Sequence, residues 1–166
     1  MMITTRKIFI LGLLTILGVL VASFYLEVIK GLQPCALCIM QRLFLMIVAV
    51  FFLLGSALPL KKCGAVFVSI CATLGNIGGL IFAGRQVWLQ HLPTKTMVDC
   101  GASLQFLLKA LPFSQAMRKI FAGSSECSVV DWQLLYLSLA EWSLICFCFL
   151  LFLSVLALLS AWKRRA

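Results

Sequence analysis

Long apolar runs without a single charged residue dominate the pattern of this chain. Four of them cover residues 8–26, 43–60, 64–84 and 142–162, and they are 19, 18, 21 and 21 residues long. A helix needs about 20 apolar residues to cross the hydrocarbon core of a bilayer. The pattern therefore predicts transmembrane helices at about residues 8–26, 39–60, 64–84 and 142–162, the second of which extends back across Arg42. The first run is too long for a signal peptide and lacks a small-residue cleavage site, so we interpret it as a span.

The composition favours a single membrane domain over residues 1–166. Apolar residues make up 63% of the chain and charged residues only 11%, whereas about 25% of the residues of a soluble protein are charged. The net charge of +9 comes from 14 Lys and Arg against 5 Asp and Glu. In a membrane protein such an excess first indicates basic cytoplasmic loops. No tract of alternating basic and aromatic residues argues for nucleic acid as a partner.

Charges at the ends of the runs predict the orientation. The basic residues of one side are Arg6, Lys7, Lys61, Lys62, Lys163, Arg164 and Arg165. The acidic residues of the other side are Glu27, Asp99, Glu126, Asp131 and Glu141. Because basic flanks stay in the cytoplasm, we expect both termini to be cytoplasmic. Two loops, at about residues 27–38 and 85–141, then face outward.

This topology divides the eight cysteines into two groups. The outward group is Cys35, Cys38, Cys100 and Cys127, and an oxidising outer compartment permits disulfides there. The other group, at the cytoplasmic turn or within spans, is Cys63, Cys71, Cys146 and Cys148. We interpret this second group as packing residues, since a free cysteine behaves as a small hydrophobic side chain.

Cys35 and Cys38 form a CxxC motif at the expected N-terminus of the second span. Exposed backbone N–H groups and the helix dipole favour an anion at this position, which suits a reactive thiolate. Arg42 lies four residues after Cys38 on the same helix face, as a fixed positive charge. The motif alone also fits a metal site or a static bridge. Arg42 also fits a side chain that anchors the helix at the interface.

The long outward loop carries two segments with helical spacing of apolar residues. The first is Leu104, Leu107, Leu108 and Leu111, and the second is Phe113, Met117, Ile120 and Phe121. We expect two short amphipathic helices in the membrane interface, broken at Pro112. A helix packed on a core of the loop itself is the alternative.

Cys100 and Cys127 enclose this amphipathic segment. The pair fits either a structural disulfide that staples the loop or an exchangeable disulfide on a mobile arm. Small residues beside both cysteines favour the access that thiol–disulfide exchange requires. Two cysteine pairs on one face of a small bundle predict electron transfer. Because the sequence has no haem motif, dinucleotide fingerprint or iron–sulfur spacing, a lipid-soluble acceptor between the helices is the simplest electron sink.

The chain resembles the disulfide bond formation protein B (DsbB) family over almost its whole length. The resemblance rests on the four spans, on PCALCIMQR at residues 34–42 and on GRQVWLQ at residues 84–90. It also rests on the second cysteine pair, as Asp99-Cys100 and Glu126-Cys127, with Trp132 and Trp142 beyond. The resemblance implies an all-α integral membrane protein of the bacterial inner membrane. Its fold would be a four-transmembrane-helix bundle with a long periplasmic loop that carries short amphipathic helices.

The resemblance also implies a quinone-reducing protein-disulfide oxidoreductase. Such a protein reoxidises a periplasmic DsbA-like thiol oxidase and passes the electrons to the membrane quinone pool, ubiquinone or menaquinone. The implied disulfides are Cys35–Cys38 and Cys100–Cys127. The thiolate of the partner would attack Cys100, Cys127 would pass the reducing equivalents to Cys35, and Cys38 would remain as a thiolate beside the quinone.

Four further residues are candidates for the quinone site that the resemblance implies. Arg42 would stabilise the thiolate and the ring oxygen. Arg85, Gln86 and His91 would contribute to the polar lining. A single histidine near a membrane boundary also fits an ordinary interfacial role.

Two other classes of protein are less compatible with the sequence. The four outward cysteines could form a zinc site, but the second pair is not a CxxC and an oxidising compartment disfavours free thiols. A proton-coupled transporter usually has a carboxylate within a span, whereas all five acids lie at or outside the ends of the spans. We therefore expect no resident metal and no transport function.

Overall fold

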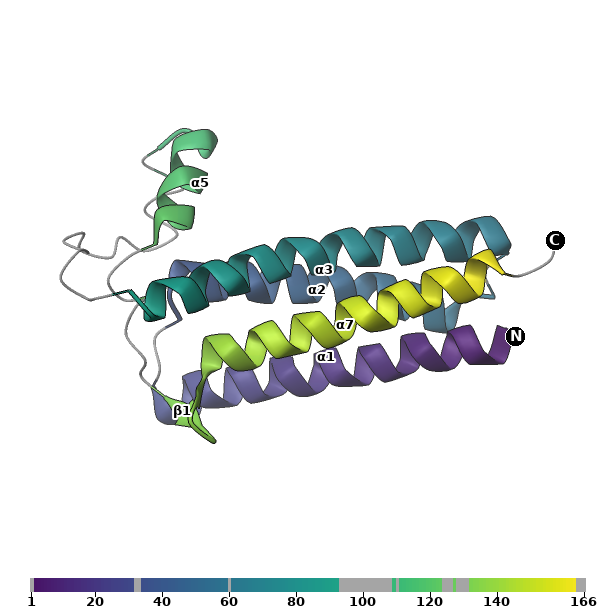
Figure 1. The fold of residues 1–166 in the computed structure, drawn as a ribbon, viewed down its shortest axis with the longest axis horizontal. Coiled ribbons are helices and arrows are strands. Elements are labelled where there is room, and N and C mark those ends of the chain that lie inside the picture. Colours follow the sequence, from purple (N-terminus) through teal and green to yellow (C-terminus); the bar gives the residue numbers. More distant parts are fainter. Residues whose placement is uncertain are drawn as a thin grey trace.

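The computed structural model describes residues 2–31, 34–59, 61–92, 109, 111–123, 127 and 132–163. Its elements carry the labels of Figure 1. The helices are α1 (Met2–Lys30), α2 (Ala36–Ala57), α3 (Lys62–Gln90), α5 (Phe113–Ala122) and α7 (Leu139–Trp162), and the strands are β1 (Gln133–Leu134) and β2 (Leu137–Ser138). Cys100 and most of the first predicted amphipathic helix lie outside the described residues.

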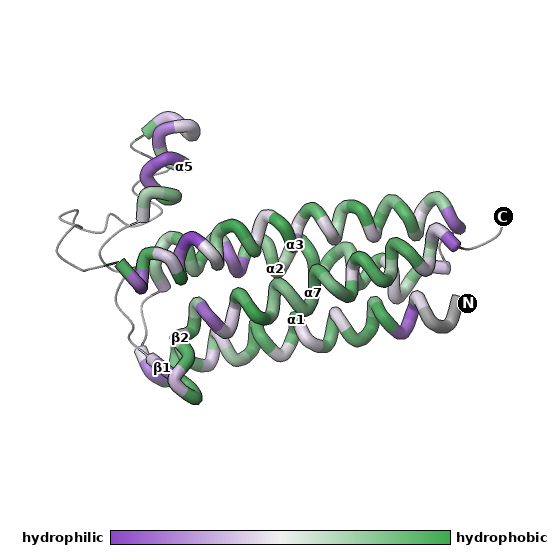
Figure 2. Tube along the Cα trace, viewed as in Figure 1, coloured by the Kyte–Doolittle hydropathy of each residue, from purple (hydrophilic) through white to green (hydrophobic). Residues whose placement is uncertain are grey.

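Helices α1, α2, α3 and α7 are long and apolar enough to cross a membrane, so the predicted four-helix membrane bundle is confirmed. Figure 2 shows the apolar middle of these helices and the more polar end of α3. Helix α3 continues to Gln90, beyond the end of the third apolar run at Gly84. Its last turns carry Arg85, Gln86 and Gln90, whose side chains bond to other parts of the protein. The apolar run therefore ends before the helix does.

Helix α3 contacts both α2 and α7, while α1 packs mainly against α2 and less extensively against α7. Glycines on α3 allow this close packing. A Cβ atom at Gly79 would overlap the ring of Phe147 on α7, and one at Gly78 would overlap the ring of Phe44 on α2. Small residues let helices approach in a membrane, where close packing is a main source of association. The looser seam between α1 and α7 leaves room for the cavity described below.

The two ends of the bundle differ in character. Both termini lie at one end, and α5 and the β-hairpin lie at the other (Figure 1). The end with the termini carries the exposed Arg6, Lys7 and Lys62. A hydrogen bond of 2.9 Å between the hydroxyls of Thr5 and Ser160 joins α1 to α7 there. These basic residues, which we call the basic turns, and the CxxC motif thus lie at opposite ends of the bundle.

Helix α5 is amphipathic, as its sequence predicts, but its apolar face packs on the protein. Ala116 and Ile120 are almost fully buried, in one cluster with Leu37 of α2 and Leu89 of α3. Phe121 of the same face is 40% exposed, so packing on the bundle replaces the expected contact with the membrane interface only for the buried part of this face. Periodicity identifies an apolar face, but it does not tell which surface covers that face.

A two-stranded hairpin precedes α7, and the sequence analysis did not predict it. Leu135 and Tyr136 have φ values of 55° and 65°, as in a type I′ turn. Asn-Gly normally signals this turn, and the dipeptide here is Leu-Tyr, so no sequence signal marks it. Trp142 Nε1 donates to Leu134 O at 3.1 Å and fixes the hairpin to α7. The hairpin therefore closes over the CxxC end of the bundle.

Candidate functional site

Cys35 and Cys38 lie at the start of α2, and the Cys35 thiol donates to Cys38 Sγ at 3.2 Å. Cys35 is the N-cap residue and has an extended backbone. The chain therefore enters the helix between the two cysteines, and a single helical turn brings both sulfurs together. Cys35 is only 6% exposed, while Cys38 is half-buried.

Cys127 packs beside Cys35, although 92 positions separate the two in the sequence. It is 1% exposed and belongs to the same buried cluster as Cys35, Leu37 and Leu89. Hydrogen bonds with Cys127 and then with Cys38, together with burial, raise the pKa of Cys35 above its ordinary value. The helix N-terminus alone would act in the opposite direction, but the neighbouring sulfurs and burial outweigh it. Three of the four predicted redox cysteines thus lie together.

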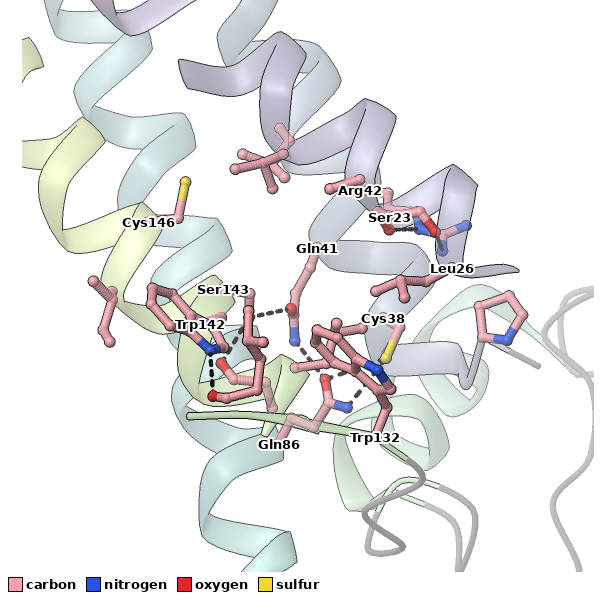
Figure 3. Close-up of a pocket in the computed structure, with 18 of the residues that line it drawn as sticks. Ser23, Leu26, Cys38, Gln41, Arg42, Gln86, Trp132, Trp142, Ser143 and Cys146 are labelled. Atoms are coloured by element: carbon pink, nitrogen blue, oxygen red, sulfur yellow. Dashed lines mark hydrogen bonds between the residues drawn. The ribbon is translucent and has the colours of Figure 1, made fainter. Parts of the chain in front are cut away.

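A chain of hydrogen bonds joins the sulfurs to α7 (Figure 3). Gln86 Nε2 of α3 donates to Cys38 Sγ at 3.1 Å and to Cys35 Sγ at 3.7 Å. Gln41 Nε2 donates to Gln86 Oε1 at 2.6 Å, and Ser143 Oγ donates to Gln41 Oε1 at 2.7 Å. The two glutamines are almost completely buried.

This chain fixes the orientation of the Gln86 amide. Because Gln86 Oε1 accepts from Gln41, the amide N–H groups face the sulfurs, although Cys38 Sγ is also 3.5 Å from Gln86 Oε1. Cys38 therefore receives hydrogen bonds from the Cys35 thiol and from Gln86. Donors directed at a sulfur suit its thiolate form. The arrangement favours Cys38 as the sulfur that carries negative charge.

Arg42 reaches across to α1. Its guanidinium forms an ion pair with Glu27, and its Nε donates to Ser23 Oγ at 2.8 Å. The guanidinium carbon also lies 5.0 Å from the centroid of the Phe24 ring. A charge at the edge of the hydrocarbon is costly unless it is paired, and Glu27 supplies the pair. Arg42 thus anchors α2 to α1.

A cavity of about 490 Å³ opens between α1, α2, α7 and the hairpin, within the range of about 300–1,000 Å³ that is typical of ligand pockets. Its polar lining includes Cys38, Gln41, Arg42 and Gln86, and also Thr15, Ser23, Glu27, Gln90 and Ser143. Among the apolar residues of its wall are Val19, Leu26, Leu45, Trp132, Ile145 and Phe149. The cavity thus joins the dithiol to an apolar space between spanning helices (Figure 3).

Arg85 lies on α3 next to Gln86, but it is not among the residues that line the cavity. Its Nε donates to Phe121 O at 3.0 Å and its Nη2 donates to Ala122 O at 3.3 Å. It therefore contacts the end of α5. The quinone contact expected for Arg85 stays a prediction.

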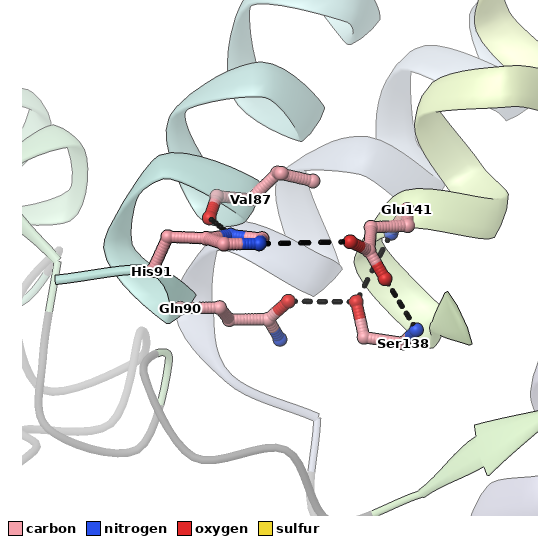
Figure 4. A network of polar contacts seen from close by, with 5 residues as sticks. All are labelled: Val87, Gln90, His91, Ser138 and Glu141. Atoms are coloured by element: carbon pink, nitrogen blue, oxygen red, sulfur yellow. Dashed lines mark hydrogen bonds and ion pairs between the residues drawn. The ribbon is translucent and has the colours of Figure 1, made fainter. Parts of the chain in front are cut away.

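His91 follows the last turn of α3 and also lies outside the lining of the cavity. Its Nδ1 is 2.9 Å from Val87 O, and its Nε2 is 3.9 Å from Glu141 Oε1 (Figure 4). Glu141 and Ser138 form the capping box of α7, and Ser138 Oγ donates to Gln90 Oε1 at 2.7 Å. This network joins the end of α3 to the start of α7. A role of His91 toward a quinone likewise stays a prediction.

The four other cysteines lie at other places in the bundle. Cys63 and Cys148 are exposed, and Cys71 and Cys146 are half-buried. Cys146 lines the cavity, although the sequence analysis treats it as a packing residue. Within the described ranges, no three His, Cys, Asp or Glu side chains are grouped to hold a metal ion.

Glu27, Gln41 and Ser143 were not among the predicted site residues, although Gln41 lies within the motif at residues 34–42. One signal was available, because Glu27 and Arg42 carry opposite charges at the same end of consecutive spans. Gln41 is an amide within a membrane helix, where buried polar groups need partners. The identity of those partners depends on how each helix is rotated, which the sequence does not reveal.

The fold and the site define a class of protein, a multi-pass membrane protein that holds a dithiol at one end of a four-helix bundle. A sequence profile of the family described as disulfide bond formation protein DsbB matches residues 5–157. The chain is 36% identical over 163 residues to disulfide bond formation protein B of Hahella chejuensis. The aligned region covers 98% of this chain and 96% of that protein. It is 40% identical over 152 residues to the protein of the same name from Psychrobacter cryohalolentis, with coverages of 89% and 85%.

A relative from Acinetobacter baumannii, also named disulfide bond formation protein B, is 40% identical over 146 residues, with coverages of 84% and 84%. The chain therefore belongs to the DsbB family, as its resemblance predicted. Membership supports the role of a disulfide-forming oxidoreductase in a membrane.

Proposed function

We propose that this chain is a thiol:quinone oxidoreductase that reoxidises a periplasmic DsbA-like thiol oxidase and passes the electrons to a respiratory quinone. One observation carries the proposal. Cys38, the second sulfur of the CxxC dithiol, lines a cavity of about 490 Å³ between spanning helices. A cavity in this position suits an electron acceptor that is dissolved in the bilayer.

The lining of the cavity fits a quinone. Apolar side chains such as Val19, Leu45 and Phe149 suit an isoprenoid chain. Arg42 lines the same cavity as Cys38, and the N–H groups of its guanidinium that do not bond to Glu27 and Ser23 suit a ring carbonyl. When bound, a quinone accepts two electrons and two protons and becomes a quinol. Ubiquinone and menaquinone share both chemical features.

Exchange among four sulfurs accounts for the thiol chemistry. We expect the resting disulfides Cys35–Cys38 and Cys100–Cys127. A partner thiolate attacks Cys100, which forms a mixed disulfide and releases Cys127 as a thiolate. Cys127 then attacks Cys35, which forms an inter-loop disulfide and releases the Cys38 thiolate. The position of Cys127 beside Cys35 supports this second step.

The remaining steps restore the starting disulfides. The second thiol of the partner attacks the mixed disulfide, so the partner leaves oxidised and Cys100 is reduced. Cys100 then attacks Cys127, which restores their disulfide and releases Cys35. The Cys35–Cys38 dithiol finally gives up two electrons and two protons and becomes a disulfide. In sum, one partner dithiol becomes a disulfide and one quinone becomes a quinol.

The proposed orientation places both termini in the cytoplasm and the cysteine end of the bundle in the periplasm of the inner membrane. Two facts support it. The basic turns lie at the end of the bundle opposite the CxxC motif, as the retention of positive loops requires. An oxidising periplasm also permits the disulfides that the mechanism needs.

Quinone reduction by the purified full chain in detergent, with a reduced DsbA-like protein as donor, tests this function. We expect turnover in the wild type, none in Cys38→Ser, and near wild-type turnover in Cys148→Ser. The last variant is a matched control because Cys148 is an exposed cysteine of α7 that does not line the cavity. Unchanged turnover in Cys38→Ser would contradict the proposal. So would a wild type that is inactive with ubiquinone, menaquinone and several donors, and zinc analysis would then test the metal alternative.

A further inference from the structure

Arg85 caps the C-terminal end of α5. The last carbonyl groups of a helix have no partner within the helix, and basic side chains often bond to them. Arg85 donates to two of these carbonyls, Phe121 O at 3.0 Å and Ala122 O at 3.3 Å. Its guanidinium carbon also lies 5.8 Å from the centroid of the Phe121 ring. A cation at this end of a helix is favourable with respect to the helix dipole as well.

The residue after α5 is held against α3 one turn beyond Arg85. Gly123 has a φ value of +86°, and a Cβ atom there would overlap the side chain of Leu89. Only glycine adopts this backbone without cost, and its hydrogen side chain permits the close approach. On the buried side, Ile120 packs in the same cluster as Leu89. Contacts from α3 therefore fix the end of α5 on two sides.

A short segment connects this end of α5 to Cys127. Three residues separate Gly123 from Cys127, so their Cα atoms are at most about 14 Å apart. Cys127 itself lies beside Cys35 in the cluster that Ile120 and Leu89 also form. A contact that holds Gly123 in place therefore restricts the volume in which the Cys127 sulfur moves.

We propose that Arg85 is a positioning residue for thiol–disulfide exchange between Cys127 and Cys35. By holding the end of α5 on α3, it raises the effective concentration of the Cys127 sulfur at Cys35. Arg85 touches neither sulfur, so it acts through the segment that carries Cys127. The inference rests on the proposed function, because it assigns Arg85 to the inter-loop step of that reaction.

An exchange equilibrium with glutathione measures this effective concentration directly. The full chain carries Cys38→Ser and Cys100→Ser, and Cys63, Cys71, Cys146 and Cys148 are also replaced by serine. Oxidised glutathione converts the remaining two thiols into the Cys35–Cys127 disulfide and becomes two molecules of reduced glutathione. The fraction of disulfide at each glutathione ratio, measured by a maleimide gel shift, gives the equilibrium constant.

Arg85→Met removes the donors and keeps the apolar stem. We expect it to lower the equilibrium constant by about 5- to 30-fold, as expected for a charged group at a partly buried helix end. Arg85→Lys keeps the charge and should fall between parent and Arg85→Met. The matched control is Arg118→Met, which removes the same charge from the exposed face of α5 and should change the constant by less than about twofold.

Three results would overturn the inference. In the first, the equilibrium constant of Arg85→Met equals that of the parent. In the second, Arg118→Met lowers the equilibrium constant as much as Arg85→Met does. In the third, the parent forms no Cys35–Cys127 disulfide. If Arg85→Met does not fold, as judged by circular dichroism, the comparison of Arg85→Lys with the parent decides. The assay contains neither quinone nor partner. If Arg85→Met lowers the equilibrium constant but the wild type reduces no quinone, only the proposed acceptor is rejected. If the wild type reduces quinone but Arg85→Met leaves the equilibrium constant unchanged, only the role of Arg85 is rejected.

Discussion

Replacement of Gln86 by leucine should slow quinone reduction while the bundle stays folded. Gln86 donates to Cys38 Sγ at 3.1 Å and accepts from Gln41 Nε2 at 2.6 Å. Leucine has a similar size but no polar atoms. The substitution therefore removes a hydrogen bond from Cys38 and leaves Gln41 Nε2 buried without this acceptor.

Typical hydrogen-bond energies give the size of both effects. A hydrogen bond to a charged group contributes about 1.5–3 kcal/mol, and about 1.4 kcal/mol corresponds to a factor of ten in rate. If Gln86 stabilises the Cys38 thiolate in the slow step, kcat falls by about 10- to 100-fold in Gln86→Leu. The orphaned amide of Gln41 lowers the free energy of unfolding by about a further 1–3 kcal/mol.

Gln41→Leu separates direct from indirect action. Gln41 reaches Cys38 only through Gln86 in this hydrogen-bond chain, so we expect kcat to fall by less than about tenfold. Each single variant leaves a buried polar partner behind, whereas the double variant removes both glutamines. The stability loss of the double variant should therefore be smaller than the sum of the single losses, by about 0.5–3 kcal/mol.

Steady-state quinone absorbance with a reduced DsbA-like donor gives kcat, and thermal unfolding in detergent gives stability. Gln115→Leu is the matched control, because Gln115 is an exposed glutamine of α5 that does not line the cavity. If the kcat of Gln86→Leu stays within about twofold of wild type, the role of the amide is refuted, because such a loss is far smaller than the loss that one hydrogen bond to a charged group predicts. Strictly additive stability losses would refute the coupling of the two glutamines.

Three further predictions concern other parts of the molecule. Cys127→Ser should abolish quinone reduction with the reduced donor, because Cys100 then belongs to no disulfide that the partner thiolate can attack; turnover close to that of the wild type would argue against the Cys100–Cys127 disulfide as the point of attack. Arg42→Ala should raise KM for quinone more than KM for the donor protein, and the reverse pattern would indicate an anchor only. Gly79→Ala should lower the free energy of unfolding by about 1–3 kcal/mol, because its methyl group overlaps an aromatic ring of α7. Gly18→Ala should leave the free energy of unfolding unchanged, because the Cβ position of Gly18 has open space around it. Equal losses for the two variants in thermal unfolding would contradict this account of the packing.

The four spans were predictable because the bilayer imposes a simple rule on length and charge. The residues at which the helices begin and end were harder to predict. Helix α3 continues past its apolar run through Gln86 and Gln90, whose side chains bond to Gln41 and Ser138. The hairpin before α7 uses Leu135 and Tyr136 at its turn, without the usual asparagine or glycine. Both features depend on tertiary contacts that override local pattern.

The residues of the site were likewise predictable only in part. Its CxxC motif and the nearby Arg42 and Gln86 are visible in the sequence as reactive or polar groups at a membrane boundary. The pairing of Arg42 with Glu27 depends on the rotation and spacing of α1 and α2. The rotation of α3 likewise decides where its polar side chains lie, so Gln86 lines the cavity and Arg85 bonds to the end of α5, since adjacent residues on a helix face different directions.

The central claim is that the Cys35–Cys38 dithiol delivers its electrons to a quinone. A single-turnover experiment tests it most directly. Fully reduced protein is mixed with one equivalent of quinone, without oxygen and without the partner, and thiols and quinol are counted. We predict two thiols lost for each quinol formed, a new Cys35–Cys38 disulfide by peptide mapping, and neither change in Cys38→Ser. Thiol loss without quinol, or quinol formation that persists in Cys38→Ser, would contradict the account.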